Sequence, residues 1–73
     1  MLFPERLKYL RKTRMIPQKV IAEHLGISVT AYQYYEAGKN EPNIEKLIKL
    51  ATLFDVSVDY LIGRTENPLM YSE

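Results

Sequence analysis

The stretch from Gln18 to Gly38 constrains the fold more than any other part of this 73-residue chain, because two short helical patterns meet there at a glycine. The first pattern covers residues 17–25 and has one apolar face. That face consists of Ile21, Ala22 and Leu25. Gly26 follows, and glycine is the residue best suited to the left-handed conformation of a tight turn between helices. The spacing therefore predicts two helices joined by a sharp turn.

The second pattern begins after Ser28, a residue type that caps helices well, and runs to about Ala37 before a glycine ends it. Ile27 is expected to fill the angle between the two helices. Positions three and four apart share a helix face. The predicted inward face consists of Ala31, Tyr32 and Tyr35, and the predicted outward face of Val29, Thr30, Gln33 and Tyr34. A helix, a turn with glycine and a second helix with such an outward face make a helix-turn-helix arrangement, which predicts a DNA-binding regulator.

Three more helices are predicted, and no alternating strand pattern is long enough to compete with them. The first covers residues 4–14, with an apolar stripe of Phe3, Leu7 and Leu10 and its basic residues on the other faces. The fourth follows the cap Asn43 and covers residues 44–54, with an inward face of Ile44, Leu47, Ile48, Ala51 and Phe54, widened by Leu50 and Leu53. The fifth is short, begins after Ser57 and ends at Gly63. We therefore predict one all-α domain of five helices over residues 1–64, with a tail over residues 65–73 that is flexible or contacts a partner.

Composition excludes several classes of protein. Cysteine is absent, so disulfides and thiolate metal sites are excluded, and no run approaches the roughly 20 apolar residues of a membrane span. The N-terminus lacks the apolar core of a signal peptide. A cytoplasmic protein is therefore expected. Residues 1–26 carry six basic and two acidic groups, a charge of +4, whereas residues 27–73 carry four and seven, a charge of −3. This asymmetry suits one end that faces a polyanion, although an ordinary solvated helix face would show it too.

Catalysis is not predicted. His24 is the only histidine, and the chain has neither a second histidine nor a cysteine to complete a metal site or a nucleophilic pair. Carboxylates are scattered, and the three glycines end helices rather than forming a phosphate loop. We expect no cofactor, no metal and no small-molecule ligand.

The chain resembles the lambda-repressor-like helix-turn-helix domains of phage repressors, Cro proteins and XRE-type bacterial regulators over about residues 3–64. The matching residues are Arg6-Leu7, Leu10-Arg11, Gln18, Ile21-Ala22, Leu25-Gly26, Ser28, Tyr35-Glu36, Gly38-Lys39, Pro42, Leu47, Leu50-Ala51, Val56 to Asp59, and Leu61. The resemblance implies a compact five-helix DNA-binding domain that acts on the nucleoid of a bacterium or on phage DNA.

The resemblance also implies roles for particular residues. The second helix of the motif would lie in the major groove, with Val29, Thr30, Gln33 and Tyr34 facing base edges. Phosphate contacts would come from Gln18, Lys19, Ser28, Lys39 and Asn40. Arg11 and Glu36 would form an internal ion pair that is structural.

Two departures from the family pattern affect these expectations. Ile16 and Pro17 stand where a serine or threonine cap is common, so that helix end lacks a side-chain acceptor. The reading face also lacks the arginine or paired glutamine that contact a base through two hydrogen bonds. Gln33 could make such a contact with adenine, and methyl groups of Val29 and Thr30 could pack on thymine. A preference for A·T-containing half-sites is therefore predicted.

A second function remains open at this point, namely an antitoxin-like or scaffold module that binds another protein. The uncharged reading face and the apolar Leu69, Met70 and Tyr71 favour it, whereas the basic N-terminal half, Gln18 and Lys39 favour DNA. A single reading helix per chain predicts a homodimer on a pseudo-palindromic operator. The dimer surface is expected on Val58, Tyr60, Ile62, Leu69 and Tyr71. Repression is favoured over activation because occluding a promoter requires only binding.

Overall fold

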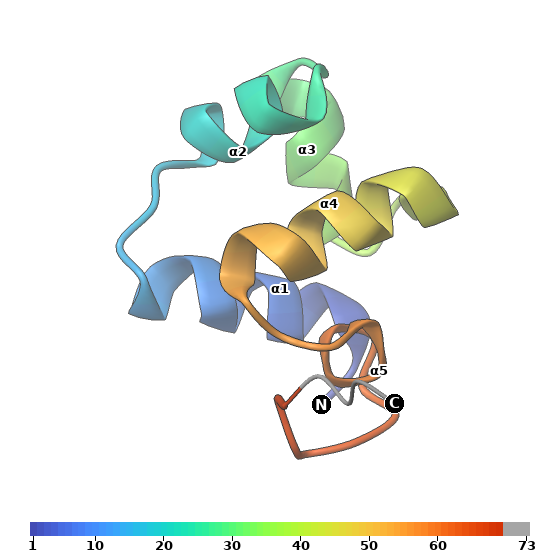
Figure 1. The fold of residues 1–73 in the computed structure, drawn as a ribbon. Helices are drawn as coiled ribbons and strands as arrows, with labels where there is room; N and C mark the ends of the chain where they lie inside the picture. The colour runs from blue at the N-terminus through green and yellow to red at the C-terminus, as the bar shows by residue number, and fades with distance from the viewer. Residues whose placement is uncertain (70–73) are drawn as a thin grey trace.

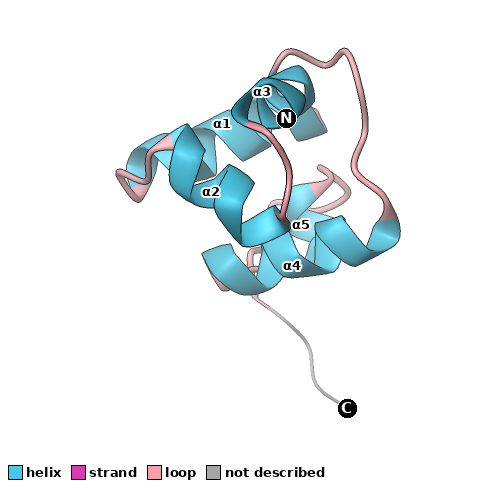
Figure 2. Cartoon of the chain, turned by 90° about the horizontal axis from the view of Figure 1, so that it is seen from above, coloured by secondary structure: helices cyan, strands magenta, loops and turns pink. Residues whose placement is uncertain are grey.

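The structure, a computed structural model, describes residues 1–69 and contains five α-helices and no strand within them (Figures 1 and 2). The helices are α1 (Phe3–Thr13), α2 (Gln18–Leu25), α3 (Val29–Glu36), α4 (Ile44–Phe54) and α5 (Val58–Leu61). The predicted all-α fold is confirmed, and each predicted boundary lies within about one residue of the observed one. Every helix within residues 1–69 is too short or too polar to cross a membrane.

Local capping explains where three of the helices begin. The side chains of Ser28, Asn43 and Ser57 each accept a hydrogen bond from a backbone N–H in the first turn of α3, α4 and α5. The start of α2 differs from the prediction by one residue, since Pro17 precedes the helix instead of opening it. The backbone of Pro17 is extended, with ψ 147°, so the helix begins at Gln18. No side chain caps this end of the helix.

The turn between α2 and α3 has the predicted form. Gly26 adopts φ 71°, in the left-handed region that glycine reaches without strain. The N–H of Gly26 donates to the Glu23 carbonyl at 3.1 Å, and that of Ile27 donates to the Ala22 carbonyl at 3.0 Å. These bonds close α2 and set its angle to α3. Ile27 packs partly buried against the core, as expected for the residue between the helices.

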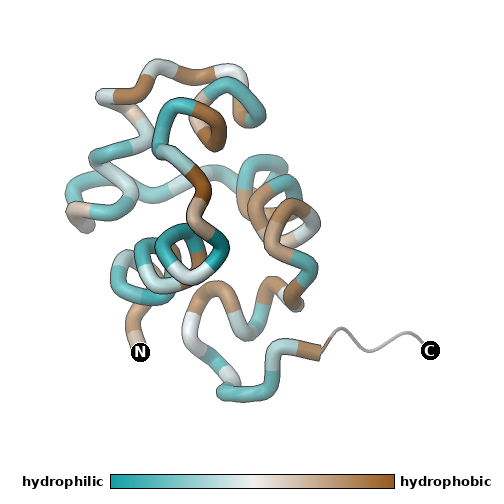
Figure 3. The backbone as a smooth tube through the Cα atoms, turned by 90° about the vertical axis from the view of Figure 1, so that its left-hand side faces the viewer, coloured by the Kyte–Doolittle hydropathy of each residue, from teal (hydrophilic) through white to brown (hydrophobic). Residues whose placement is uncertain are grey.

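One hydrophobic core lies between the helices. Its buried side chains are Leu7, Leu10, Ile21, Ala22, Leu25, Tyr32, Tyr35, Leu50, Ala51, Phe54, Val56 and Leu61. Hydrophobic and hydrophilic residues alternate along the turns of the helices, as Figure 3 shows. All five helices contribute to this core, and α3 packs against α1 as well as against α2.

The predicted inward face of α4 is partly wrong. Ile44 is 75 % exposed and Ile48 is 53 % exposed, whereas Leu50 is fully buried. The first turn of α4 projects past the neighbouring helices in Figure 1, so Ile44 has little to pack against. Ile48 lies at the edge of the stripe centred on Leu50 and Phe54. The buried face of α4 is therefore rotated from the one predicted.

Arg6 also differs from the prediction, because it is a core residue and does not belong to the exposed basic face of α1. It is 1 % exposed, and its guanidinium carbon lies 3.8 Å from the centroid of the Tyr60 ring. The guanidinium donates to the Tyr60 carbonyl at 3.1 Å and to the Glu66 carboxylate at 2.8 Å. The core thus includes a buried cation that joins α1 to α5 and to residue 66.

Residues 65–69 lie against the domain. Besides the Arg6–Glu66 pair, the N–H of Ser57 donates to the Pro68 carbonyl at 3.0 Å. Leu69 is 65 % exposed. The expected end of the domain at residue 64 is therefore not the end of its internal contacts. Met70 and Tyr71, which the sequence suggested as partner contacts, lie outside the described residues.

Candidate nucleic-acid interface

Helix α3 has a buried face and an exposed face, and the exposed face is the candidate interface. Tyr32 and Tyr35 are buried, with their rings in an edge-to-face contact at 6.3 Å between centroids. Thr30, Gln33 and Tyr34 are exposed. The two buried rings fix the rotation of α3 about its axis, so the three exposed side chains point together into solvent.

Val29 differs from the prediction that placed it on the exposed face. It is only partly exposed and packs against the core. Side chains of a helix lean toward its N-terminus, and Val29 is the first helical residue, so it leans over the preceding turn. Its methyl groups are less available to a base than those of a fully outward residue.

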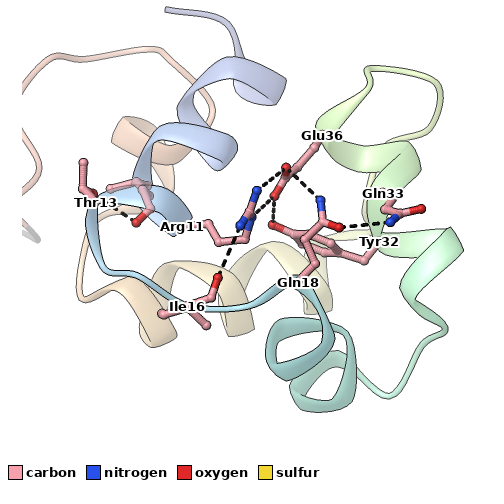
Figure 4. A network of polar contacts seen from close by, with 8 residues as sticks. Arg11, Thr13, Ile16, Gln18, Tyr32, Gln33 and Glu36 are labelled. Atoms are coloured by element: carbon pink, nitrogen blue, oxygen red, sulfur yellow. Dashed lines mark hydrogen bonds and ion pairs between the residues drawn. The ribbon is translucent and has the colours of Figure 1, made fainter.

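A hydrogen-bond network centred on Glu36 joins the end of α3 to α1 (Figure 4). The Nε of Arg11 donates to Glu36 at 2.5 Å, and its Nη2 donates at 3.1 Å. The Tyr32 hydroxyl donates to the same carboxylate. The side chains of Arg11 and Glu36 are only 14 % and 4 % exposed. The expected internal pair therefore has a two-pronged geometry, and it is shielded from water.

The network also sets the charge states of its members. Burial tends to raise the pKa of Glu36, but hydrogen bonds from Arg11, Tyr32 and Gln18 outweigh it and hold the pKa of this carboxyl below its ordinary value of 4.5. The hydrogen bond to Glu36 raises the pKa of Arg11. Burial, and then the bond to Glu36, raises the pKa of the Tyr32 hydroxyl. At neutral pH the site therefore contains a carboxylate, a guanidinium and a neutral phenol.

Two glutamine side chains extend this network to the exposed face of α3. The Nε2 of Gln18, in the first turn of α2, donates to Glu36 Oε1 at 3.3 Å. The Nε2 of Gln33 donates to Gln18 Oε1 at 3.0 Å (Figure 4). The structure thus brings together Gln18, which was predicted to contact a phosphate, and Gln33, which was predicted to contact a base. This pairing across the turn was not predicted.

The other predicted phosphate contacts are exposed at the ends of α2 and α3. Lys19 follows Gln18 in the first turn of α2, and the Ser28 hydroxyl already accepts from the Ala31 N–H at 3.0 Å. Beyond α3, Lys39 places its Nζ 5.8 Å from the centroid of the Tyr34 ring. Asn40 accepts a bond from the Glu41 N–H. Lysines and helix ends therefore flank the exposed face of α3.

Part of the positive charge of residues 1–26 serves the fold instead of a surface. Arg6 and Arg11 are tied to Glu66 and Glu36, and Arg14 donates to the Phe54 carbonyl at 2.9 Å. The exposed cationic side chains in this segment are Lys8, Lys12, Arg14 and Lys19. The charge asymmetry of the sequence therefore overstates the charge available to a polyanion. Among residues 1–69 no three acidic or histidine side chains gather as a metal site would require, and His24 is exposed.

A turn-linked helix pair with an exposed second helix defines a helix-turn-helix protein, and comparison with known families agrees. The chain belongs to the helix-turn-helix family, whose model matches residues 7–61. It is 42 % identical over 67 residues to an uncharacterised HTH-type transcriptional regulator, YobD of Bacillus subtilis, covering 92 % of this chain and 60 % of that protein. It is also 42 % identical over 60 residues to the cryptic phage CTXphi transcriptional repressor RstR of Vibrio cholerae, covering 82 % and 54 %.

Among solved structures, the fold is similar to the P22 c2 repressor in complex with a synthetic operator. The TM-score is 0.81 at 32 % identity, and the match covers 89 % of this chain and 98 % of that one. The resemblance to phage repressors and bacterial regulators is thus confirmed. The chain spans between half and two thirds of the length of the two curated relatives named above.

Proposed function

We propose that this chain is a sequence-specific transcriptional regulator of the repressor type, which binds double-stranded DNA and reads the major groove with α3. The observation that carries the proposal is the exposed face of α3, whose opposite face is buried through two tyrosines and joined to α1 by the Arg11–Glu36 pair. A helix presented in this way on a compact domain is the unit that helix-turn-helix proteins insert into the groove. No catalytic role is proposed.

Base contacts are assigned to the exposed side chains of α3. Gln33 can accept from and donate to adenine, the Thr30 methyl can pack on thymine, and the Tyr34 ring can reach a base or a phosphate. Val29 has a smaller role because it is partly buried. An operator with A·T pairs in each half-site fits this set of side chains.

Phosphate contacts are assigned to the ends of the two helices. Gln18 and Lys19 lie where the first turn of α2 has free N–H groups and a partial positive charge. Ser28, Lys39 and Asn40 flank α3 and would hold the two sides of the groove. These contacts carry affinity without sequence information, so they should make binding depend steeply on salt.

Two copies are proposed to bind one operator, with half-sites about 34 Å apart. The predicted surface on α5 is only partly available, since Val58, Tyr60 and Ile62 are each partly buried. Ile48 of α4 lines a groove with Val56 and Val58, which extends the candidate surface toward α4. A protein that sediments as a monomer both free and on operator DNA would contradict this part of the proposal.

Binding titrations by fluorescence anisotropy at several salt concentrations test the proposal, with operators enriched from random duplex DNA. We expect Lys39→Ala to weaken all duplexes similarly and to reduce the salt slope by about one. Gln33→Ala should instead cost roughly 1–3 kcal/mol at one base pair. Lys49→Ala is the control, because Lys49 is an exposed lysine of α4 that pairs with Glu45 outside the proposed interface.

The antitoxin-like or scaffold alternative predicts a different result. A protein-binding module would show no enriched duplex, and neither Gln33→Ala nor Lys39→Ala would change what weak DNA affinity it has. A well-folded protein with that behaviour would refute the DNA-reading proposal. A DNA-binding repressor works where the DNA is, so the proposal also places the chain on the bacterial nucleoid.

A further inference from the structure

We propose that Tyr34 is a positioning residue, whose ring holds the ammonium group of Lys39 in place for a DNA phosphate beyond the C-terminal end of α3. The inference rests on the proposed function and deepens it, because it gives an exposed residue of α3 a role that acts through a phosphate contact. Four observations carry it: the backbone turn after α3, the distance between the two side chains, their exposure, and the absence of a competing carboxylate within residues 1–69.

The backbone at the end of α3 determines where Lys39 lies. Gly38 adopts φ 74°, in the left-handed region, and its N–H donates to the Tyr35 carbonyl at 3.3 Å. The N–H of Lys39 donates to the Tyr34 carbonyl at 2.9 Å. These two bonds form the Schellman motif, in which a left-handed residue turns the chain back over the last turn of the helix. The turn therefore places Lys39 beside Tyr34.

The side chains of these two residues then meet. In a Schellman motif the corresponding two positions frequently make a hydrophobic contact. Here one position holds a tyrosine and the other a lysine, and the Lys39 Nζ lies 5.8 Å from the centroid of the Tyr34 ring. This distance is within the range of about 6 Å over which an aromatic face attracts a cation. An attraction between a ring and a charge thus takes the place of the usual apolar contact.

The ammonium group of Lys39 remains available to an external anion. Tyr34 is 45 % exposed, and Lys39 is exposed as well. Among residues 1–69 no carboxylate lies within ion-pair distance of Lys39, whereas Lys49 pairs with Glu45 at 3.6 Å. A ring attracts the charge through its quadrupole, so this contact leaves the three N–H donors of the ammonium free for oxygen acceptors. A phosphate can therefore bind Lys39 while the ring still holds it.

The ring contributes to affinity by ordering the lysine side chain. A lysine loses much rotamer freedom when it binds a phosphate, because its four-carbon stem is flexible. A contact that already restricts the ammonium group reduces this loss on binding. A cation–ring attraction at an exposed site corresponds to a factor of about 2 to 5 in an equilibrium constant. The contribution of Lys39 to DNA affinity should therefore depend on the residue at position 34.

The alternative is that Tyr34 and Lys39 contact DNA independently. Removal of either side chain would then weaken binding by the same factor whether or not the other is present. A positioning role predicts that the two losses are coupled. Lys19 is the matched control, because it is an exposed lysine in the first turn of α2 that is also proposed to contact a phosphate. Within residues 1–69 the only cation over the Tyr34 ring is that of Lys39.

The experiment is a double-mutant cycle, measured by fluorescence anisotropy on an enriched operator and on a duplex of unrelated sequence. Lys39→Ala is made in wild type, in Tyr34→Phe, which keeps the ring, and in Tyr34→Leu, which removes it. We expect Lys39→Ala to weaken binding by the same factor in wild type and Tyr34→Phe. In Tyr34→Leu this factor should be about 2 to 5 times smaller on both duplexes. Lys19→Ala should weaken binding by one common factor in all three backgrounds.

Each other outcome overturns the inference in a recognisable way. If Tyr34→Leu leaves the effect of Lys39→Ala unchanged, the two residues act independently, and the proposed function stands without this inference. If the coupling is lost in Tyr34→Phe as well, the hydroxyl group acts and not the ring. If the effect of Lys19→Ala also depends on position 34, leucine has disturbed the whole interface and the specific pairing is refuted. If no operator is enriched and binding does not depend on salt, the proposed function fails with the inference.

A measurement without DNA tests the contact itself. The ring current of an aromatic side chain shifts protons that lie over its face upfield. In NMR spectra of the free protein, the Hε protons of Lys39 should therefore resonate upfield of those of Lys49, which pairs with a carboxylate instead. The shift should persist in Tyr34→Phe and disappear in Tyr34→Leu. Equal Hε shifts for Lys39 and Lys49 in the wild-type protein would contradict the inference.

Discussion

Removal of the Tyr32 hydroxyl tests the energetic role of the Glu36 network. Tyr32→Phe keeps the buried ring but deletes one donor to a carboxylate whose side chain is 4 % exposed. A hydrogen bond to a charged group contributes about 1.5–3 kcal/mol. In the variant, Arg11 still donates to the Glu36 carboxylate through two nitrogens, so the buried charge keeps its hydrogen-bond partner. The lower half of this range therefore applies. We expect a loss of about 1.5–2 kcal/mol, or roughly 6–16 °C in Tm for a domain of this size.

The penalty of Tyr32→Phe should also depend on pH in one direction. The pKa of Glu36 is lowered in the folded state, so its contribution is fully present above its ordinary value of 4.5 and is lost as the pH falls through the folded-state value. Below that value the Tyr32 hydroxyl faces a neutral carboxyl, and neutral hydrogen bonds contribute about 0.5–1.5 kcal/mol. The difference between wild type and variant should therefore shrink in acid.

Urea unfolding followed by far-ultraviolet circular dichroism, at pH 7 and at a series of decreasing pH values, measures both effects, with equal m-values as the sign of an unchanged unfolding transition. Tyr34→Phe is the control, because Tyr34 is 45 % exposed, and its stability should stay within about 0.5 kcal/mol of wild type. A Tyr32→Phe protein as stable as wild type at pH 7, or a penalty that stays the same after Glu36 has become protonated in the folded protein, would refute this reasoning.

Three further changes separate buried from exposed features, and thermal melts measure all of them. Gly63→Ala should cost about 2 kcal/mol or more, because φ is 89° there and a Cβ would overlap the carbonyl oxygen of Met1. Gly26→Ala should cost only about 1 kcal/mol, because φ is 71° there but the added Cβ would meet open space. Equal losses of stability in the two variants would contradict this prediction. Leu50→Ala should cost about 2–5 kcal/mol and Ile48→Ala less than about 0.5 kcal/mol, and a reversed order would restore the face of α4 predicted from the sequence. Arg6→Met should cost at least about 1 kcal/mol, since it deletes the stacking and hydrogen bonds of a buried cation. Unchanged stability of this variant would mean that the Arg6 side chain stabilises the fold through its packing alone.

The helix boundaries could be predicted from the sequence because they depend on local chemistry. Ser28, Asn43 and Ser57 each cap the helix that follows, through a bond to a residue only three positions away. Gly26 takes the conformation that its residue type favours. The pair of Arg11 and Glu36 was expected from the family resemblance, and its atoms lie within hydrogen-bond distance.

Tertiary packing decided what the sequence could not predict. Seven of the eleven residues of α4 are apolar, so several stripes fit a helical period, and only the neighbouring helices select the buried one. Arg6 lies on the side of α1 that faces α5, where an aromatic ring and a carboxylate compensate its charge. The bond between Gln18 and Gln33 joins residues fifteen positions apart across a turn, and no local pattern indicates it.

The central claim is that the exposed face of α3 reads base pairs, and a binding-site selection from random duplex DNA tests it most directly. The selection would use wild type and a variant in which Thr30, Gln33 and Tyr34 are replaced by alanine, each at two salt concentrations. We predict that wild type enriches an inverted repeat with A·T pairs in each half-site, that high salt abolishes the enrichment, and that the variant enriches no motif at either concentration although it remains folded. Enrichment of the same repeat by both proteins, or of no sequence by a folded wild type, would contradict the claim.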